Sequence, residues 1–313
     1  KIIVKSNSGN FLVFFATSKK FINTFKNYTS ISAKLYAKRN NIGILLIDHE
    51  LISKKEKFYK KPTWQKWLIP DYIKKNYKNI KNFFYLDCDI VINPSAPNIF
   101  KQYKFDKILV TSVRKNMPYT FEEATKKISY LRRKYLNKNF PLDTSLVMGL
   151  DETYKYHNLQ TQKDEFCAGA FGCSVKVFSD FFKKSFFKYK SNIWSITGGG
   201  DQTHFNYEII KSKKFRLINY KYQTLWSFEV AIKYPFLYKN HFKKINSRLV
   251  ADCVLASLFS SWFLHFAGTW PDSKCFFNKK VYNDSFFKKY FFEFQKYNSK
   301  KLKPRPRGVI KFK

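Results

Sequence analysis

The sequence predicts an α/β fold, a single domain whose mixed, mostly parallel central sheet is flanked by helices. Strand-like apolar segments alternate with amphipathic helix-like segments through the first half of the chain. The expected strands cover 10–17, 43–48, 83–92 and 107–113, and the expected helices cover 20–39 and 63–77. Such alternation is typical of parallel strands joined by covering helices. With 313 residues, 44% of them hydrophobic, the chain is long enough to bury a large core.

The second half of the chain is less regular. Small residues open the segment 166–189, which predicts a strand followed by a Phe-rich helix. The segment 198–212 predicts a loop of three glycines that enters a helix at Asp201, a good N-terminal residue for a helix. Further strands are expected at 215–220 and 262–268. We assign residues 1–275 to the domain and residues 276–313 to a basic, aromatic-rich C-terminal helix and extension.

A large positive charge dominates the composition. The 59 Lys and Arg against 22 Asp and Glu give a formal net charge of +37, which would suit a nucleic acid or an anionic membrane surface. Only eight of the 59 are Arg, the residue that best recognises phosphates and bases. Lys, Asn, Ile, Tyr and Phe have A/T-rich codons, so a genome of low GC content also explains the charge. We expect no specific nucleic-acid binding and leave peripheral contact with an anionic membrane open.

The remaining composition favours a cytoplasmic or peripheral-membrane protein. The five cysteines form no CxxC pair and no zinc spacing, so we expect reduced core residues. No run of about 18 apolar residues predicts a membrane-spanning helix. The chain begins at Lys1 without a Met, which leaves room for an upstream signal or anchor.

The segment 83–94, FFYLDCDIVINP, places two carboxylates in an apolar strand. Residues two apart in a strand share a face, so Asp87 and Asp89 should point the same way, with Cα atoms about 6.5–7 Å apart. They come near the end of the strand, where parallel sheets bind ligands. Two unpaired buried carboxylates would repel each other, whereas Mn²⁺ or Mg²⁺ would satisfy both. The alternative is a strand end that simply meets solvent.

Three more motifs follow Asp-x-Asp in the order of a GT-A, Rossmann-like glycosyltransferase. They are FCAGAFG at 166–172, GGGDQTHFN at 198–206 and LHFAGTW at 264–270. Over residues 10 to 275 the chain most resembles the retaining enzymes of glycosyltransferase family 8, with echoes of families 6 and 34. It has no P-loop, GxGxxG, HExxH or GxSxG signature.

The resemblance implies a role for particular residues. Asp87, Asp89 and His265 would hold Mn²⁺ or Mg²⁺, and Asp201 and Gln202 would be catalytic residues on the sugar side. The donor-binding residues would be Ala16, Thr17, Lys66, Asp87, Gly169, Gly268 and Lys274. The glycines that border the sugar and the acceptor would be Gly199 and Gly200.

The chain departs from the family at two positions. Cys167 stands where the family has Asn, and Pro271 stands where it has a Lys that contacts diphosphate, a place that Lys274 would take over. Three residues also have a structural alternative. His265 could be a hydrogen-bonded core histidine, Asp201 only a helix cap, and Gln202 only a polar residue of a first helical turn.

The implied activity is transfer of a sugar from a nucleotide-sugar donor to a hydroxyl of a glycan or other acceptor, with retention. A UDP-sugar is the donor that the resemblance favours. A covalent intermediate on Gln202 and a front-face attack are both open. A nucleotidyltransferase could use the same Asp-x-Asp metal site but would not need His265 or the Asp-Gln motif. A non-enzymatic basic protein that binds nucleic acid or anionic surfaces is the third class.

Overall fold

The computed structural model describes residues 1–141, 146–193, 200–240, 242, 246–284, 289–290 and 293. The strands are β1 (Ile2–Val4), β2 (Asn10–Phe15), β3 (Gly43–Ile47), β4 (Asn82–Leu86), β5 (Ile90–Ile92), β6 (Ile108–Ser112), β7 (Phe166–Ser174), β8 (Phe215–Leu217), β9 (Thr224–Leu225) and β10 (Phe263–His265). The α-helices are α1 (Lys19–Thr24), α2 (Ser30–Asn40), α3 (Pro62–Gln65), α4 (Ile69–Asn76), α5 (Ile99–Gln102), α6 (Phe121–Leu131), α7 (Leu150–Tyr156), α8 (Val175–Lys188), α10 (Gln202–Ser212), α11 (Trp226–Lys233), α12 (Phe236–Asn240), α13 (Ser247–Ser260), α14 (Pro271–Lys274) and α15 (Lys279–Asp284). Short π or 3₁₀ turns are η1 (Phe25–Thr29), η2 (Lys66–Leu68), η3 (Arg132–Leu136), η4 (Ser191–Ile193), η5 (Tyr220–Gln223) and η6 (Cys275–Phe277).

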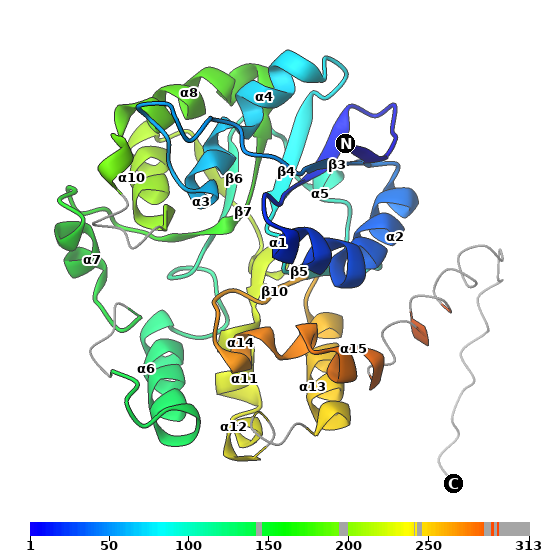
Figure 1. Cartoon of the computed structure of the whole chain (residues 1–313), viewed down its shortest axis with the longest axis vertical. Helices are drawn as coiled ribbons and strands as arrows, with labels where there is room; N and C mark the ends of the chain where they lie inside the picture. Colours follow the sequence, from blue (N-terminus) through cyan, green and yellow to red (C-terminus); the bar gives the residue numbers. More distant parts are fainter. Residues whose placement is uncertain are drawn as a thin grey trace, which may run out of the picture.

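A seven-stranded sheet forms the centre, in the order β1-β3-β2-β4-β7-β6-β8. The pairs β2–β3, β2–β4 and β6–β8 are parallel. The pairs β1–β3, β4–β7 and β6–β7 are antiparallel. The predicted mixed sheet in a single α/β domain is therefore confirmed, with strands and helices alternating as the sequence indicated (Figure 1).

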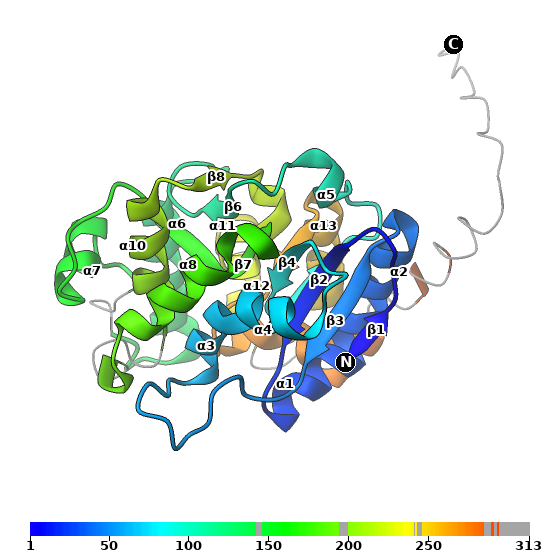
Figure 2. The same ribbon diagram turned by 90° about the horizontal axis from the view of Figure 1, so that it is seen from above.

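Helices cover both faces of this sheet, which explains why the central strands are apolar throughout. In β2, Phe11 and Val13 pack in the cluster beneath α4, α8 and α10, and these helices lie side by side in both views (Figures 1 and 2). Leu12 and Phe14 point the other way, into the cluster that includes Ala33 of α2. Alternate residues thus bury against opposite helical layers.

The predicted strand 83–92 is wrong in one respect: it is two strands. β4 ends at Leu86, the chain turns through 87–89, and β5 begins at Ile90. The Ile90 amide donates to the Asp87 carbonyl across this turn at 3.1 Å. β5 then joins a second sheet of order β5-β10-β9. Because both strands are buried, the apolar pattern runs on without a break, and periodicity alone could not show the turn.

A third packed cluster lies beyond the small sheet, where α6, α11, α12, α13 and α14 gather at the lower end of the view (Figure 1). Its buried side chains include Ile128 of α6, Trp226 of α11 and Val254 of α13. Val281 of α15 is also buried there, so the start of the predicted C-terminal segment packs against the domain. Most of that segment, including 294–313, lies outside the described residues.

Two expectations from the composition agree with the structure. All five cysteines are unpaired and buried, as predicted for reduced core residues. Across the part of the chain that the structure describes, none of the helices has the length and apolarity needed to cross a bilayer.

Candidate metal and donor site

The structure brings Asp87, Asp89 and His265 together into what we call the Asp-Asp-His cluster. One ligand atom from each lies within 4.8 Å of the other two. Nε2 of His265 is 3.6 Å from Oδ2 of Asp87 and 3.3 Å from Oδ1 of Asp89. The turn after β4 supplies the carboxylates, and antiparallel pairing of β5 with β10 sets His265 opposite Ile90. The turn therefore achieves the convergence that we expected from strand alternation.

The Asp-Asp-His cluster fits a divalent cation. Oδ1 of Asp89 is buried without a well-formed hydrogen bond, and Nε2 of His265 lies 3.3 Å from it. A buried carboxylate oxygen left in this way is costly unless a cation binds it. Carboxylates suit Mg²⁺ and Mn²⁺, and imidazole is a common ligand of divalent metals. Gly169 adds the space: a Cβ there would lie 2.3 Å from Cε1 of His265 and 2.7 Å from Oδ2 of Asp87. A close approach of backbone to the cluster thus requires glycine at this position.

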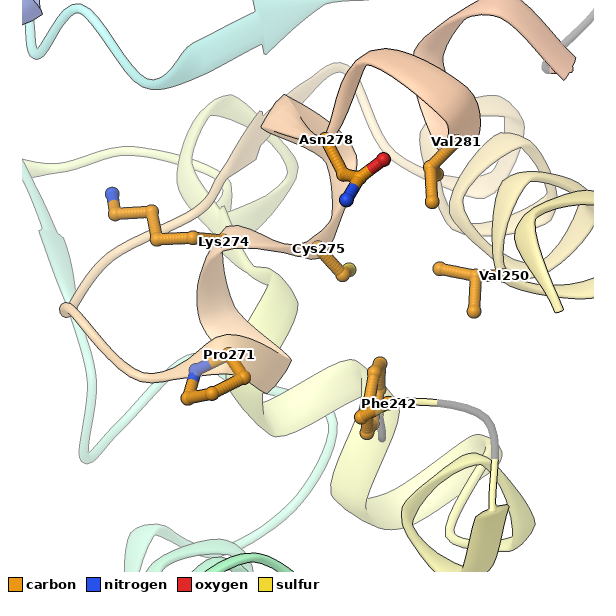
Figure 3. Close-up of a pocket in the computed structure, with 7 residues that line it drawn as sticks. All are labelled: Phe242, Val250, Pro271, Lys274, Cys275, Asn278 and Val281. Atoms are coloured by element: carbon orange, nitrogen blue, oxygen red, sulfur yellow. The ribbon is translucent and has the colours of Figure 1, made fainter. Parts of the chain in front are cut away.

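Lys274 reaches the same cluster from α14. Its ammonium contacts Oδ2 of Asp89 and donates to the carbonyl of Phe266 at 2.7 Å. Figure 3 shows a hollow that Lys274 borders on one side and Val250 and Phe242 on the opposite side. The ammonium of Lys274 points away from this hollow. The residues lining the hollow are Phe242, Val250, Pro271, Lys274, Cys275, Asn278 and Val281. This places the ammonium of Lys274 beside the Asp-Asp-His cluster. A contact of Lys274 with diphosphate, in place of the family lysine, stays a prediction.

Burial and charge perturb every titratable group of the cluster. Burial alone would raise the pKa of Asp89, but His265 and Lys274 outweigh it and hold that pKa well below its usual range. Burial raises the pKa of Asp87, against the opposing charge of Lys66. Burial would lower the pKa of His265, but its close contact with Asp89 and the charge of that carboxylate raise it to about 10. The two carboxylates thus favour positive charge between them.

A buried ion pair lies next to the cluster. The ammonium of Lys66 is 2.9 Å from Oδ1 of Asp201, with side-chain exposures of 6% and 5%. The indole of Trp67 donates to the other oxygen of Asp201 at 2.7 Å. Burial would lower the pKa of Lys66, but the charges of Asp201 and Asp87 raise it. Asp201 makes no side-chain capping bond to α10, so the interpretation of this residue as only a helix cap is wrong.

Gln202 is held by a carboxylate that sequence reasoning missed. Its Nε2 donates to Oε1 of Glu165 at 2.9 Å. Arg114 donates to Oε2 of Glu165 through Nε at 3.1 Å and Nη2 at 2.9 Å. The sequence held one signal for this pair: in a chain with few Arg and Glu residues, Arg114 follows one expected strand and Glu165 precedes another. The amide of Gln202 is therefore oriented by partners at the ends of β6 and β7.

The other predicted donor and acceptor residues are less closely tied to the cluster. Ala16 and Thr17 follow β2 at its carboxyl end, and Gly268 follows β10 with a left-handed φ of 94°. Within the described part of the chain, no hydrogen bond or ion pair joins these residues to the Asp-Asp-His cluster. The carbonyl of Gly200 accepts from an indole of α3 at 2.9 Å, and Gly199 lies outside the described residues.

Three further neighbours of the cluster were not predicted as site residues. The hydroxyl of Tyr85 donates to Oδ1 of Asp87. On the far side of the imidazole, Nδ1 of His265 lies 3.7 Å from Sγ of Cys167 and 3.4 Å from Nε2 of Gln223. Tyr85 and Gln223 carry no pattern in the sequence, whereas Cys167 stands out only because it replaces the Asn of the family.

Comparison with known proteins gives only distant likenesses. No protein-family model and no curated protein sequence matches the chain. One similar solved structure is a glycosyltransferase involved in glycosylation of the major capsid protein of PBCV-1, with 9% identity, a TM-score of 0.48, and coverage of 85% of this chain and 97% of that one. The bifunctional glycosyltransferase WbbM is 11% identical with a TM-score of 0.43, over 93% of this chain and 52% of that one. The galactosyltransferase LgtC, in complex with donor and acceptor sugar analogs, is 12% identical with a TM-score of 0.45, over 94% and 98%.

Proposed function

We propose that the chain is a metal-dependent glycosyltransferase that moves a sugar from a nucleotide-sugar donor to a hydroxyl of a glycan or other acceptor, with retention. The donor that we favour is a UDP-sugar. The observation that carries this proposal is the Asp-Asp-His cluster, whose ligand atoms lie within 4.8 Å of one another. A buried Lys66–Asp201 pair stands beside it. These residues come from the motifs on which the sequence resemblance rests.

The Asp-Asp-His cluster, together with Lys66 and Lys274, would bind the diphosphate of the donor. Asp87, Asp89 and His265 would hold Mn²⁺ or Mg²⁺, which when bound supplies Lewis-acid neutralisation of the leaving diphosphate. Lys274 contacts Asp89, so its ammonium is close enough to the cluster to bind phosphate oxygens on the same side. The charge of Lys66, which both Asp201 and Asp87 stabilise, lies between the cluster and the helix start at α10. Both lysines would offset the charge of the donor.

The helix start at α10 supplies the sugar side. In the transfer, the bond from the anomeric carbon to the diphosphate oxygen breaks, and the acceptor oxygen forms the new bond to that carbon. An amide is a weak nucleophile, so we propose front-face attack in which the acceptor proton passes to the departing diphosphate. Gln202, oriented by Glu165, would then hold the sugar or acceptor through hydrogen bonds. Asp201, bound by Lys66 and Trp67, would fix the position of that helix start.

Product analysis tests this proposal. The protein is incubated with Mn²⁺, a panel of UDP-hexoses and UDP-N-acetylhexosamines, and glycan acceptors, and both UDP and pyrophosphate are quantified. We expect UDP release with at least one donor, lost in Asp89→Ala and kept in Asp180→Ala, whose carboxylate is 71% exposed on α8. A parallel incubation contains nucleoside triphosphates and a sugar phosphate. Pyrophosphate release there, without UDP release from any donor, would instead identify a nucleotidyltransferase.

A further inference from the structure

Gln223 is a fully buried amide that faces the back of the candidate metal ligand. It ends η5 and precedes β9, which runs parallel to β10 with Leu225 opposite His265. Gln223 therefore lies directly before the strand that holds Leu225 against His265. Nε2 of Gln223 lies 3.4 Å from Nδ1 of His265. Gln223 has an exposure of 0%, and its Oε1 is buried without a hydrogen-bond partner.

The two nitrogens of His265 have coupled roles. Nε2 faces Asp87 and Asp89 at 3.6 and 3.3 Å, so it is the nitrogen that would give its lone pair to a cation. Nδ1 must then carry the proton and donate it to an acceptor. The amide nitrogen of Gln223 has no lone pair to offer, whereas its Oε1 accepts hydrogen bonds. Rotation of the amide by about 180° about its last side-chain bond exchanges the two atoms.

We propose that Gln223 is a positioning residue for the metal centre: its Oε1 accepts from Nδ1–H of His265 and so keeps Nε2 free for the cation. The inference rests on the proposed function, since it assumes a cation in the Asp-Asp-His cluster. It gives the unpartnered Oε1 of Gln223 a hydrogen bond. Sγ of Cys167, 3.7 Å from the same Nδ1, is the competing acceptor, but a thiol sulfur is the weaker of the two.

Mn²⁺ binding without nucleotide tests the proposal, because it reads the metal centre directly. Free Mn²⁺ is measured by electron paramagnetic resonance in a titration of the whole chain. In Gln223→Met, which keeps the length but removes the acceptor, we expect the Kd for Mn²⁺ to rise about 10- to 100-fold. Gln223→Glu, which keeps an acceptor oxygen, should bind Mn²⁺ at least as tightly as wild type.

Asn93→Leu is the matched control for the loss of a buried amide. Asn93 donates to the carbonyls of Leu258 and Ser261 and makes no contact with His265. This variant should lower the melting temperature while the Kd for Mn²⁺ stays within about twofold of wild type. A loss of Mn²⁺ binding in Asn93→Leu equal to that in Gln223→Met would overturn the proposal, because general loosening would then explain both.

Two other results would overturn it, and they are distinguishable. If wild type binds Mn²⁺ and Gln223→Met binds it equally well, Gln223 has no positioning role; a loss confined to Cys167→Ala would make the thiol the acceptor. If wild type itself binds no Mn²⁺, the metal centre of the proposed function fails, and the role of Gln223 fails with it.

Discussion

Gly169→Ala is the substitution with the most sharply defined structural consequence. The new Cβ would lie 2.3 Å from Cε1 of His265 and 2.7 Å from Oδ2 of Asp87. Ordinary carbon contacts begin near 3.4 Å, so the imidazole would have to retreat by about 1 Å. β7 is paired on both sides, with β4 and β6, so the strand itself can give little. The displacement therefore falls on the metal ligands.

We expect two effects of different size. Displacing a ligand by about 1 Å should weaken Mn²⁺ binding and turnover by about 10²-fold or more. Overpacking of this kind should also destabilise the fold by about 1–3 kcal/mol. Mn²⁺ affinity and turnover measure the first effect, and urea denaturation with excess chelator measures the second.

Gly172→Ala on the same strand separates the two effects. Its Cβ would meet Cδ2 of Phe84 at 2.5 Å and Cε1 of Phe105 at 2.9 Å, far from the carboxylates. The fold should lose a similar 1–3 kcal/mol, about as expected for overpacking, while the folded fraction binds Mn²⁺ normally. If Gly169→Ala binds Mn²⁺ as tightly as Gly172→Ala does, the reasoning about the cluster is refuted.

Three further predictions concern Gln202, the Lys66–Asp201 pair and His204. Gln202→Ala should lower kcat at least tenfold, which corresponds to a rise of about 1.4 kcal/mol or more in the activation free energy. The Kd for UDP should stay nearly unchanged, because a transition-state contact affects turnover and not ground-state affinity. A loss of UDP affinity in calorimetry would place the sugar pocket elsewhere. Lys66→Met should destabilise the fold by about 3–5 kcal/mol in urea, since it leaves Asp201 as an unpaired buried charge, and adding Asp201→Asn should restore at least half; no recovery in the double variant would show that the pair is not coupled. Burial lowers the pKa of His204 from 6.5 to about 3, so the stability from its neutral form is complete above pH 6.5 and declines as pH falls toward 3. Wild type should therefore lose about 2 kcal/mol more than His204→Phe between pH 7 and 5, and equal losses in urea would contradict the assignment.

Most of the architecture was predictable from local pattern. The apolar run of β2 and the helix signals at 20–39 and 202–212 are each set by the residues of the element itself, so their positions agree with the structure. The turn at 87–89 was not predictable, because β4 and β5 are both buried and the apolar run gives no sign of the break. Only the pairing of β5 with β10, which is remote in sequence, shows that β5 has left the central sheet.

The candidate site divides in the same way. Asp87, Asp89 and His265 could be selected because ionisable residues stand out in apolar stretches, and the structure brings them together. Glu165 had only the weak signal of an acidic residue next to a strand, and Gln223 had none, since their significance lies in which atom they face across the fold. Asp201 illustrates the limit of local rules: its position matches a helix cap, yet its carboxylate binds Lys66.

Calorimetry with UDP tests the central claim, metal-dependent donor binding at the Asp-Asp-His cluster, most directly. UDP is titrated into wild type and Asp89→Ala, each with Mn²⁺ and each with EDTA. The Asp-Asp-His cluster, with the buried carboxylate of Asp89, predicts that wild type binds UDP with Mn²⁺, that EDTA abolishes binding, and that Asp89→Ala binds in neither buffer. Equal UDP affinity with and without chelator, or unchanged Mn²⁺-dependent binding in Asp89→Ala, would contradict the account.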